Sequence, residues 1–223
     1  MLKNRHVVIT GAAGTLGQAA AQKARDYGAH VTGLDLVDAG ALDNTDKYQQ
    51  LNLLDRDATL ECFRSLGKAD VLFNIAGGFA MGDDASDPDS DQWDRMFQIN
   101  VETMRNATMG AIPLLLAGGG GAVVNIGALG ALTGQGAMSA YCCAKSSVMK
   151  LTESLSEELR HKGVNVNAVL PSIIDTPPNR QDMPDANFSD WVSPVQLAEV
   201  ICFLASNSAS AIHGALIPVR GLA

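Results

Sequence analysis

Short apolar runs alternate with stretches of helical periodicity along the whole chain. The strand-like runs occupy 7–10, 31–35, 49–53, 71–75, 122–126, 164–170 and 216–219. Apolar residues spaced three and four apart predict helices between them, at 16–27, 58–66, 93–116, 139–161 and 194–205. The last helix has a clear start, because Ser193 can cap it, Pro194 suits its first position and Gln196 completes a capping box.

This alternation predicts the fold class. Strands that are apolar almost throughout are typical of a parallel sheet covered by helices on both faces. Right-handed crossovers then give a doubly wound, Rossmann-type α/β fold of about seven strands. With 47% hydrophobic residues among 223, the chain can form one core, so we expect a single domain over 1–223.

One predicted loop, 82–91, is strongly acidic. It carries five aspartates: Asp83, Asp84, Asp87, Asp89 and Asp91. The spacing of the last three resembles a calcium loop, but Gln92 and Gln98 stand where such a loop needs glycine and glutamate. We therefore expect a solvated loop and no metal site.

A second predicted loop, 171–192, is rich in proline, aspartate and asparagine. It follows the carboxyl end of the sixth predicted strand, which is where doubly wound folds bind ligands. We expect this stretch to form a substrate lid.

The net charge and the cysteine spacing limit which binding partners and which cellular compartment are expected. The net charge of −8 argues against nucleic acid and anionic membranes as partners. No apolar run is long enough to span a membrane, and the first one is too short for a secretory signal. The four cysteines lack the spacing of a zinc site or a redox pair, so reduced thiols and a cytoplasmic location are expected.

A glycine-rich turn joins the first predicted strand to the first helix. Gly11 permits a tight turn, Gly14 lets the backbone approach a pyrophosphate, and Gly17 lets the helix pack on the sheet. Thr15 lies in the turn and Leu16 begins the helix, whose exposed first N–H groups would hold phosphates. This pattern predicts a dinucleotide site; a purely structural turn is the weaker alternative.

Asp35 ends the second predicted strand, 18 residues after Gly17. A carboxylate at this spacing binds the adenosine ribose hydroxyls and repels a 2′-phosphate. The sequence therefore favours NAD over NADP, although a turn aspartate with no ligand is an alternative.

Tyr141 and Lys145 lie four residues apart on a predicted helix and so share one face. A nearby ammonium favours phenolate, so the pair predicts a tyrosine whose pKa is lowered towards neutrality, as suits a proton donor or acceptor. Alone, such a pair is more often a surface pair without function.

Together, the glycine-rich turn, Asp35 and the Tyr141/Lys145 pair resemble the short-chain dehydrogenase/reductase family over essentially the whole chain. The resemblance implies that Tyr141 is the general acid in carbonyl reduction and that Lys145 lowers its pKa and binds the nicotinamide ribose. It also implies that Asn100 kinks the long helix 93–116 and maintains a proton relay.

The resemblance extends to further cofactor-binding positions. Asn74-Ile75-Ala76-Gly77 matches a family motif after the fourth strand, and 167–171 with Thr176 matches the segment at the nicotinamide end. The implied cofactor-binding residues, besides those above, are Asn52, Leu53, Asn74, Ala76, Gly77, Pro171, Ile174 and Thr176.

The main departure from the family pattern is Ala128, where the family normally has a serine that binds the substrate carbonyl. This alanine, the glycine spacing and the predicted lid resemble the dihydropteridine reductase branch. A quinonoid pterin is an already polarised electrophile, so our hypothesis is that its reduction does not require a serine to activate a carbonyl. Within the lid, Arg180 is a candidate to steer a polar substrate and Trp191 to stack on a planar one; a surface ion pair and lid packing are their respective alternatives.

The function implied is an NAD(H)-dependent oxidoreductase that acts on a carbonyl or quinonoid small molecule. Ala128 leaves open a non-catalytic nucleotide-binding redox sensor or scaffold as the alternative. The resemblance further implies a homodimer or homotetramer that pairs through the helices 93–116 and 139–161.

Overall fold

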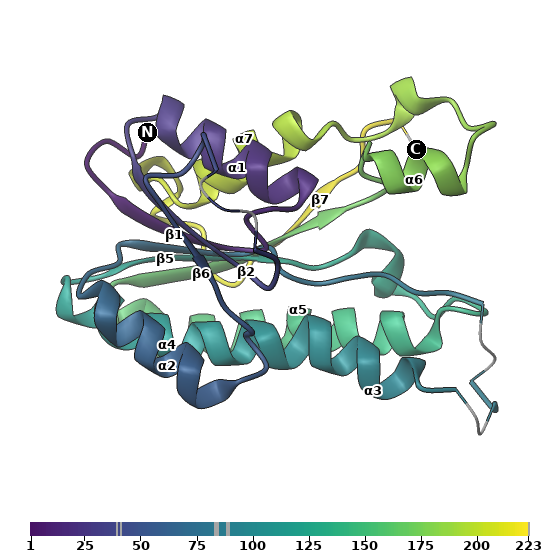
Figure 1. The fold of residues 1–223 in the computed structure, drawn as a ribbon, viewed down its shortest axis with the longest axis horizontal. Helices are drawn as coiled ribbons and strands as arrows, with labels where there is room; N and C mark the ends of the chain where they lie inside the picture. Colours follow the sequence, from purple (N-terminus) through teal and green to yellow (C-terminus); the bar gives the residue numbers. More distant parts are fainter. Residues whose placement is uncertain (39, 41, 83–84, 88–89, 223) are drawn as a thin grey trace.

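The computed structural model describes residues 1–38, 40, 42–82, 85–87 and 90–222. Its strands form one parallel seven-stranded sheet in the order β3-β2-β1-β4-β5-β6-β7, which confirms the predicted doubly wound fold (Figure 1). The strands are β1 His6–Thr10, β2 His30–Asp35, β3 Lys47–Gln50, β4 Val71–Asn74, β5 Gly121–Ile126, β6 Val164–Pro171 and β7 Leu216–Val219.

Helices cover both faces of the sheet (Figure 1). On one face lie α1 Thr15–Asp26 and α7 Pro194–Leu204, and on the other α2 Arg56–Leu66, α4 Thr103–Ala117 and α5 Ser139–Leu159. Each face has its own apolar core, and the alternating side chains of the strands contribute to both. The capping box predicted at the start of α7 is formed by Ser193 and Gln196.

Because all strands are parallel, their carboxyl ends meet at one end of the sheet and their amino ends at the other. We call these the carboxyl end and the amino end of the sheet. The predicted glycine-rich turn, Asp35 and the lid all follow strands, so the topology brings them together at the carboxyl end.

The third strand differs from its prediction at 49–53. It runs from Lys47 to Gln50 as an edge strand paired only with β2, and it is largely exposed. Leu51 and Leu53, whose hydrophobicity suggested the strand, follow it and are buried under α2 and α4. An edge strand needs few apolar residues, because one of its sides is not paired. The apolar residues at 51 and 53 therefore indicated a contact with the core and not the strand that pairs with β2.

The helix predicted at 93–116 is interrupted. α3 Gln92–Phe97 leads into a π-helical turn, η1 Gln98–Glu102, and then into α4. Asn100 lies in this turn, which is the form taken by the kink that the family resemblance implies. Such turns are frequent at functional sites.

The lid is more regular than the loop predicted at 171–192. It contains helix α6 Pro177–Asp182 and a 3-10 turn, η4 Phe188–Asp190, and Ile174 pairs with Val192 across its base. In the acidic stretch, Asp83, Asp84 and Asp89 lie outside the described residues.

Three further features of the structure bear on the predictions from composition. Among the described residues, no group of three or more histidine, cysteine, aspartate or glutamate side chains could hold a metal ion. No helix in the described part of the chain has the length and apolar character to cross a membrane. All four cysteines are free.

Candidate active site

Two glycines of the glycine-rich loop are required by the fold itself. Gly11 has φ +69°, and a Cβ there would lie 2.7 Å from the amide nitrogen of Ala76. A Cβ on Gly17 would lie 2.0 Å from the carbonyl oxygen of Gly11. At Gly14 a Cβ would meet only that same oxygen, at an ordinary 3.4 Å. Protein packing therefore explains Gly11 and Gly17 and leaves Gly14 unexplained.

The loop leads into an open helix start. Gly14 is the N-cap of α1, no side chain caps the helix, and its first turn carries no acidic residue. The N–H groups of Thr15, Leu16 and Gly17 have no partner within the helix, since the first such bond is donated by Gln18. Unpaired donors at the positive end of a helix, beside a glycine with free space, fit the pyrophosphate of a dinucleotide.

Asp35 lies at the end of β2, against this loop. Its Oδ2 accepts a hydrogen bond of 2.9 Å from the N–H of Ala13, and its Oδ1 accepts one of 3.2 Å from Val37. The carboxylate thus holds the loop in place and keeps lone pairs that can accept from ribose hydroxyls.

Asn52 and Leu53, two of the implied cofactor-binding residues, differ in exposure. The exposed Asn52 folds its own loop, because its Oδ1 accepts from the N–H of Leu54 at 3.0 Å. Leu53 is buried in the core, and its carbonyl accepts from Asn106 at 2.9 Å. The side chain of Leu53 therefore serves the core and is almost fully shielded from solvent.

Asn74 is buried and joins the sheet to the helices. Its Nδ2 donates to Thr108 at 3.0 Å and to Asn125 at 2.9 Å. Asn125 in turn donates to Thr152 on α5. Its side chain lies in this network, so any contact of Asn74 with a cofactor would have to come from its backbone.

Ala76 and Gly77 carry the chain past the predicted catalytic pair. The N–H of Ala76 donates to Thr10 at 3.2 Å. A Cβ on Gly77 would lie 2.6 Å from Oδ1 of Asn100 and 3.5 Å from Nζ of Lys145. Glycine at this position lets the loop lie directly against both side chains.

Asn100 holds the next residue, Gly78, with two hydrogen bonds. Its Oδ1 accepts from the N–H of Gly78 at 3.1 Å, and its Nδ2 donates to the carbonyl of Gly78 at 3.0 Å. The same Nδ2 also donates to Met96 at 3.1 Å. The amide is therefore committed to positioning the loop, and a proton relay through Asn100 would have to use its main-chain carbonyl.

Tyr141 and Lys145 lie on α5 as predicted, but their electrostatics differ from the expectation. Nζ of Lys145 is buried and donates to the carbonyl of Ile126 at 2.9 Å; burial lowers its pKa to about 8. Burial, with a smaller contribution from Cys142, raises the pKa of the Tyr141 phenol to about 12. The expected lowering of the tyrosine pKa is thus wrong for this structure, because desolvation of the phenol dominates.

Ala128 lies beside Tyr141 in an apolar cluster. It is 5% exposed and packs with Ala131, Cys142 and the partly buried Met138 and Tyr141. No side-chain donor stands at position 128, so this side of the tyrosine is apolar.

The lid residues near the end of β6 bond mainly to one another. Pro171 ends the strand, and the hydroxyl of Thr176 caps α6 by accepting from the N–H of Asn179 at 3.4 Å. Asn179 also donates to the carbonyl of Ile174 at 2.8 Å. The lid is thereby tied to its own base.

Arg180 and Trp191 are engaged within the lid. Arg180 forms a bidentate ion pair with Asp175 at 2.5 and 2.7 Å and lies 4.6 Å over the ring of Phe188. Trp191 is 6% exposed and its ring centroid lies 4.9 Å from that of Phe188. These contacts favour the structural alternatives for both residues, an ion pair and lid packing, over the predicted substrate contacts.

One aromatic residue at the site has no clear sequence signal. Phe79 follows the two glycines after β4, and its ring meets that of Tyr141 edge-on, with centroids 4.9 Å apart and planes at 84°. A lone phenylalanine in a sequence is read as core, but this one is 49% exposed. Only its position two residues after Gly77 could have pointed to it.

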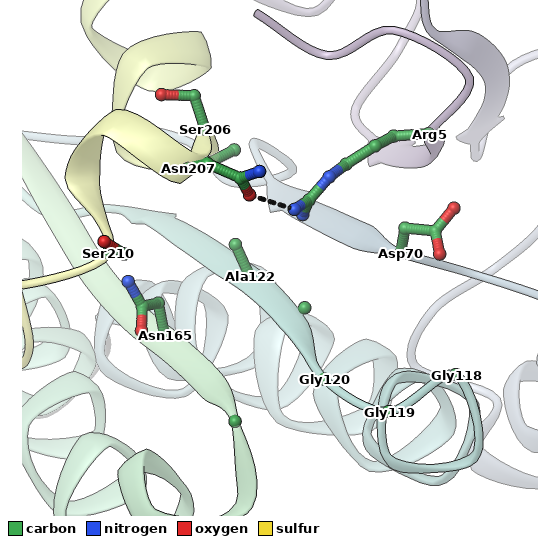
Figure 2. A pocket seen from close by; sticks show the side chains of 13 residues that line it. Arg5, Asp70, Gly118, Gly119, Gly120, Ala122, Asn165, Ser206, Asn207 and Ser210 are labelled. Atoms are coloured by element: carbon green, nitrogen blue, oxygen red, sulfur yellow. Dashed lines mark hydrogen bonds between the residues drawn. The ribbon is translucent and has the colours of Figure 1, made fainter.

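A hollow of about 330 Å³ lies elsewhere, at the amino end of the sheet (Figure 2). It is lined by Arg5, Asp70, the glycine loop 118–121 and polar residues near Asn207. None of the predicted site residues lines it, so the chemistry of the chain points to the carboxyl end.

The chain is similar to known oxidoreductases over almost its whole length. Meso-2,3-butanediol dehydrogenase of Serratia marcescens is 31% identical, over 98% of this chain and 94% of that protein. The 3-ketoacyl-(acyl-carrier-protein) reductase of Brucella melitensis, solved with NADH, superposes with a TM-score of 0.87 at 25% identity, covering 99% of this chain and 98% of that one.

A gluconate 5-dehydrogenase of Beutenbergia cavernae, described as putative NAD(P)-dependent and solved with bound NADP, superposes with a TM-score of 0.88 at 26% identity, covering 99% and 96% of the two chains. The family model for short chain dehydrogenases matches residues 5–187. The chain therefore belongs to the short-chain dehydrogenase/reductase family of oxidoreductases, which bind NAD or NADP.

Proposed function

We propose that this protein is an NADH-dependent reductase that transfers a hydride to a carbonyl or quinonoid small molecule, with Tyr141 as the proton donor. The observation that carries the proposal is the pairing of the partly buried Tyr141 with the buried Lys145, which lies beside Gly77 at the same end of the sheet as the open start of α1. A protein that only bound a nucleotide would not need the phenol of Tyr141 as a proton donor.

The residues suit the reducing direction. The bound nicotinamide would supply a hydride to the acceptor carbon. Since its pKa is about 12, Tyr141 keeps its proton at neutral pH and can donate it to the acceptor oxygen. The acceptor gains one hydride and one proton and becomes an alcohol or a dihydro product, and the phenolate regains a proton from solvent.

Lys145 supports this step in two ways. With a pKa of about 8 its ammonium is mostly charged at neutral pH, so it stabilises the phenolate that forms when Tyr141 gives up its proton. One of its three N–H donors goes to Ile126, which leaves two that can bind a ribose hydroxyl.

The preference for NADH is supported by Asp35, whose carboxylate would repel a 2′-phosphate. The test compares kcat/KM for NADH and NADPH in the wild type and in Asp35→Ser. We expect the wild type to favour NADH and the variant to shift the ratio towards NADPH by roughly tenfold or more, about 1.4 kcal/mol. A wild type that favours NADPH would contradict the proposal.

Turnover is tested by NADH oxidation with a panel of ketones, quinones and quinonoid dihydropterin. Tyr141→Phe should lower kcat by about 10²–10⁴-fold while leaving NADH binding intact. Tight NADH binding without turnover of any acceptor would favour the redox-sensor alternative, for which Ala128 is the supporting feature.

Quinonoid dihydropterin is included because Ala128 provides no donor to polarise a carbonyl. If the natural acceptor is already polarised, Ala128→Ser should leave pterin reduction within about twofold. A serine that raises the rate on simple ketones by 10-fold or more would instead indicate a lost donor, since one positioned donor is worth about 10²–10³ in kcat.

We also propose self-association through α4 and α5. Met109, Ile112 and Leu116 are spaced along α4 so as to share one face, and all three stay partly exposed. Light scattering coupled to size exclusion should find a dimer or tetramer, and Ile112→Glu should shift it towards monomer. An oligomer unaffected by this change would place the interface elsewhere.

A further inference from the structure

Phe79 is an exposed apolar residue in direct contact with the predicted proton donor. Its ring is 49% exposed, yet its centroid lies 4.9 Å from that of Tyr141. Because the two planes stand at 84°, the edge of one ring points at the face of the other, and part of Phe79 stays open to solvent. A molecule that receives the proton of Tyr141 must therefore lie close to Phe79.

The backbone before Phe79 is held firmly. Asn100 binds both the N–H and the carbonyl of Gly78, the residue directly before it. Ala80, directly after it, packs with Met96 against α3 and α5. A half-exposed phenylalanine between two anchored neighbours is a preorganised surface and not a loose loop residue.

Tyr141 also packs against a second group of apolar residues. Ala128 and Ala131 are buried there, with Met138 packed against them. Tyr141 thus contacts both Phe79 and an apolar cluster that has no side-chain donor at position 128. An acceptor that depends on several polar contacts finds few here, whereas a flat ring finds an aromatic face and one proton donor.

We propose that Phe79 is a specificity-determining residue whose exposed ring binds the planar, conjugated ring of the acceptor while Tyr141 protonates its oxygen. This inference rests on the proposed reductase function, and it names the substrate class: ring ketones or quinonoids whose carbonyl is fused or conjugated to an aromatic plane. The aromatic contact that the sequence assigned to Trp191 is thereby given to Phe79.

The experiment uses the holoenzyme with NADH and two ketones that differ only by a fused benzene ring, 1-indanone and cyclopentanone. In each reaction the carbonyl carbon gains the hydride, the oxygen gains the proton of Tyr141, and NADH becomes NAD⁺. The measured quantity is the ratio of kcat/KM for 1-indanone to that for cyclopentanone. This ratio reports contact with the extra ring and cancels general damage to folding or cofactor binding.

Phe79→Ala should lower this ratio by roughly 10-fold, since one aromatic contact is worth about that much. Phe79→Tyr keeps the ring and should restore the ratio to within about twofold of the wild type. Phe203→Ala is the matched control: Phe203 is a similarly half-exposed phenylalanine, 38% exposed, on α7 and outside the site, and its loss should leave the ratio unchanged.

A ratio that stays the same in Phe79→Ala overturns the inference. If the wild type reduces neither ketone, ketone reduction fails as a function, and the inference is then decided by calorimetric binding of 1-indanone to the NADH-loaded protein. Weaker binding to Phe79→Ala than to wild type supports the ring contact, and equal binding, or none to either protein, refutes it.

Discussion

Two glycine-rich loops lie at opposite ends of the sheet, and only one of them fits a nucleotide. The loop 11–17 follows β1 at the carboxyl end. The loop 118–121 leads into β5 at the amino end, and Figure 2 shows this second loop. The lack of space for a side chain does not distinguish the two loops. A Cβ on Gly17 would lie 2.0 Å from a carbonyl oxygen, and one on Gly120 would lie 2.3 Å from the carbonyl oxygen of Gly163.

The two loops differ in which end of a helix they adjoin and in whether their N–H groups already have hydrogen-bond partners. The first loop opens α1, whose initial N–H groups have no partner within the helix. The second loop closes α4, and the N–H groups of Gly118 to Gly121 all donate to carbonyls, those of Leu114, Leu116, Leu115 and Gly163. Glycine content therefore marks tight backbone packing, and unpaired donors at a helix start mark an anion site.

The largest effect is expected from Lys145→Met, which removes the buried cation at the carboxyl end. We expect kcat to fall by about 10³-fold, because the forming phenolate loses its charge partner. The matched control is Lys150→Met, on the same helix with a side chain that is 78% exposed, which should keep near wild-type activity. Equal losses in both variants would mean that burial at 145 has no catalytic importance.

The same variant carries a pH test of stability. Burial lowers the folded-state pKa of Lys145 to about 8 from 10.5, so the unfolded chain binds this proton more tightly than the folded chain. The wild type should therefore gain stability as pH rises from about 8 to 10.5. Lys145→Met should lack this gain, so its free energy of unfolding relative to wild type should fall over that window in urea titrations.

The next largest effect should come from the two crowded glycines. Gly17→Ala and Gly120→Ala should each lose roughly 3 kcal/mol of unfolding free energy, since the new Cβ overlaps backbone that cannot move away. Urea titrations measure this loss. Of the two variants, only Gly17→Ala should also bind NADH more weakly when the affinity is measured on the molecules that remain folded. Equal weakening by Gly120→Ala would break the comparison of the two loops.

A smaller and more selective effect is expected from Gly14→Ala. The position has φ −71° and room for a Cβ, so the melting temperature should stay within a few degrees of the wild type or rise. NADH affinity should nevertheless fall about 10-fold or more, because the methyl group occupies space next to the phosphate donors. Unchanged affinity, measured by calorimetry, would show that the pyrophosphate does not approach Gly14.

The smallest effect is expected at the amino end. Arg5→Ala breaks the hydrogen bond of 2.6 Å from Arg5 to Asn207 in the hollow of Figure 2. Because this hollow is remote from the carboxyl ends of the strands, kcat/KM should stay within about twofold of the wild type, and stability should change by less than about 1 kcal/mol. A large loss of activity would show that the two ends of the sheet are coupled.

Local signals in the sequence sufficed for most of the fold. Apolar strands alternating with helical periodicity predicted the parallel sheet, because burial on both faces imposes that pattern directly on each strand. The prediction failed at β3, where Leu51 and Leu53 mark a core contact after an exposed edge strand. Backbone pairing of an exposed edge strand requires no hydrophobic residues, so the sequence carries no pattern that marks it.

The sequence by itself determined the fold class, the glycine-rich turn, Asp35 and the Tyr141/Lys145 pair, because short spacings within one strand, turn or helix define them. Only the tertiary structure decided that Phe79 meets Tyr141, that Asn100 holds Gly78, and that Arg180 and Trp191 serve the lid. It also decided that burial raises the pKa of Tyr141 instead of lowering it. These features depend on contacts between segments far apart in the chain and on the loss of water around them, and neither is encoded in local spacing.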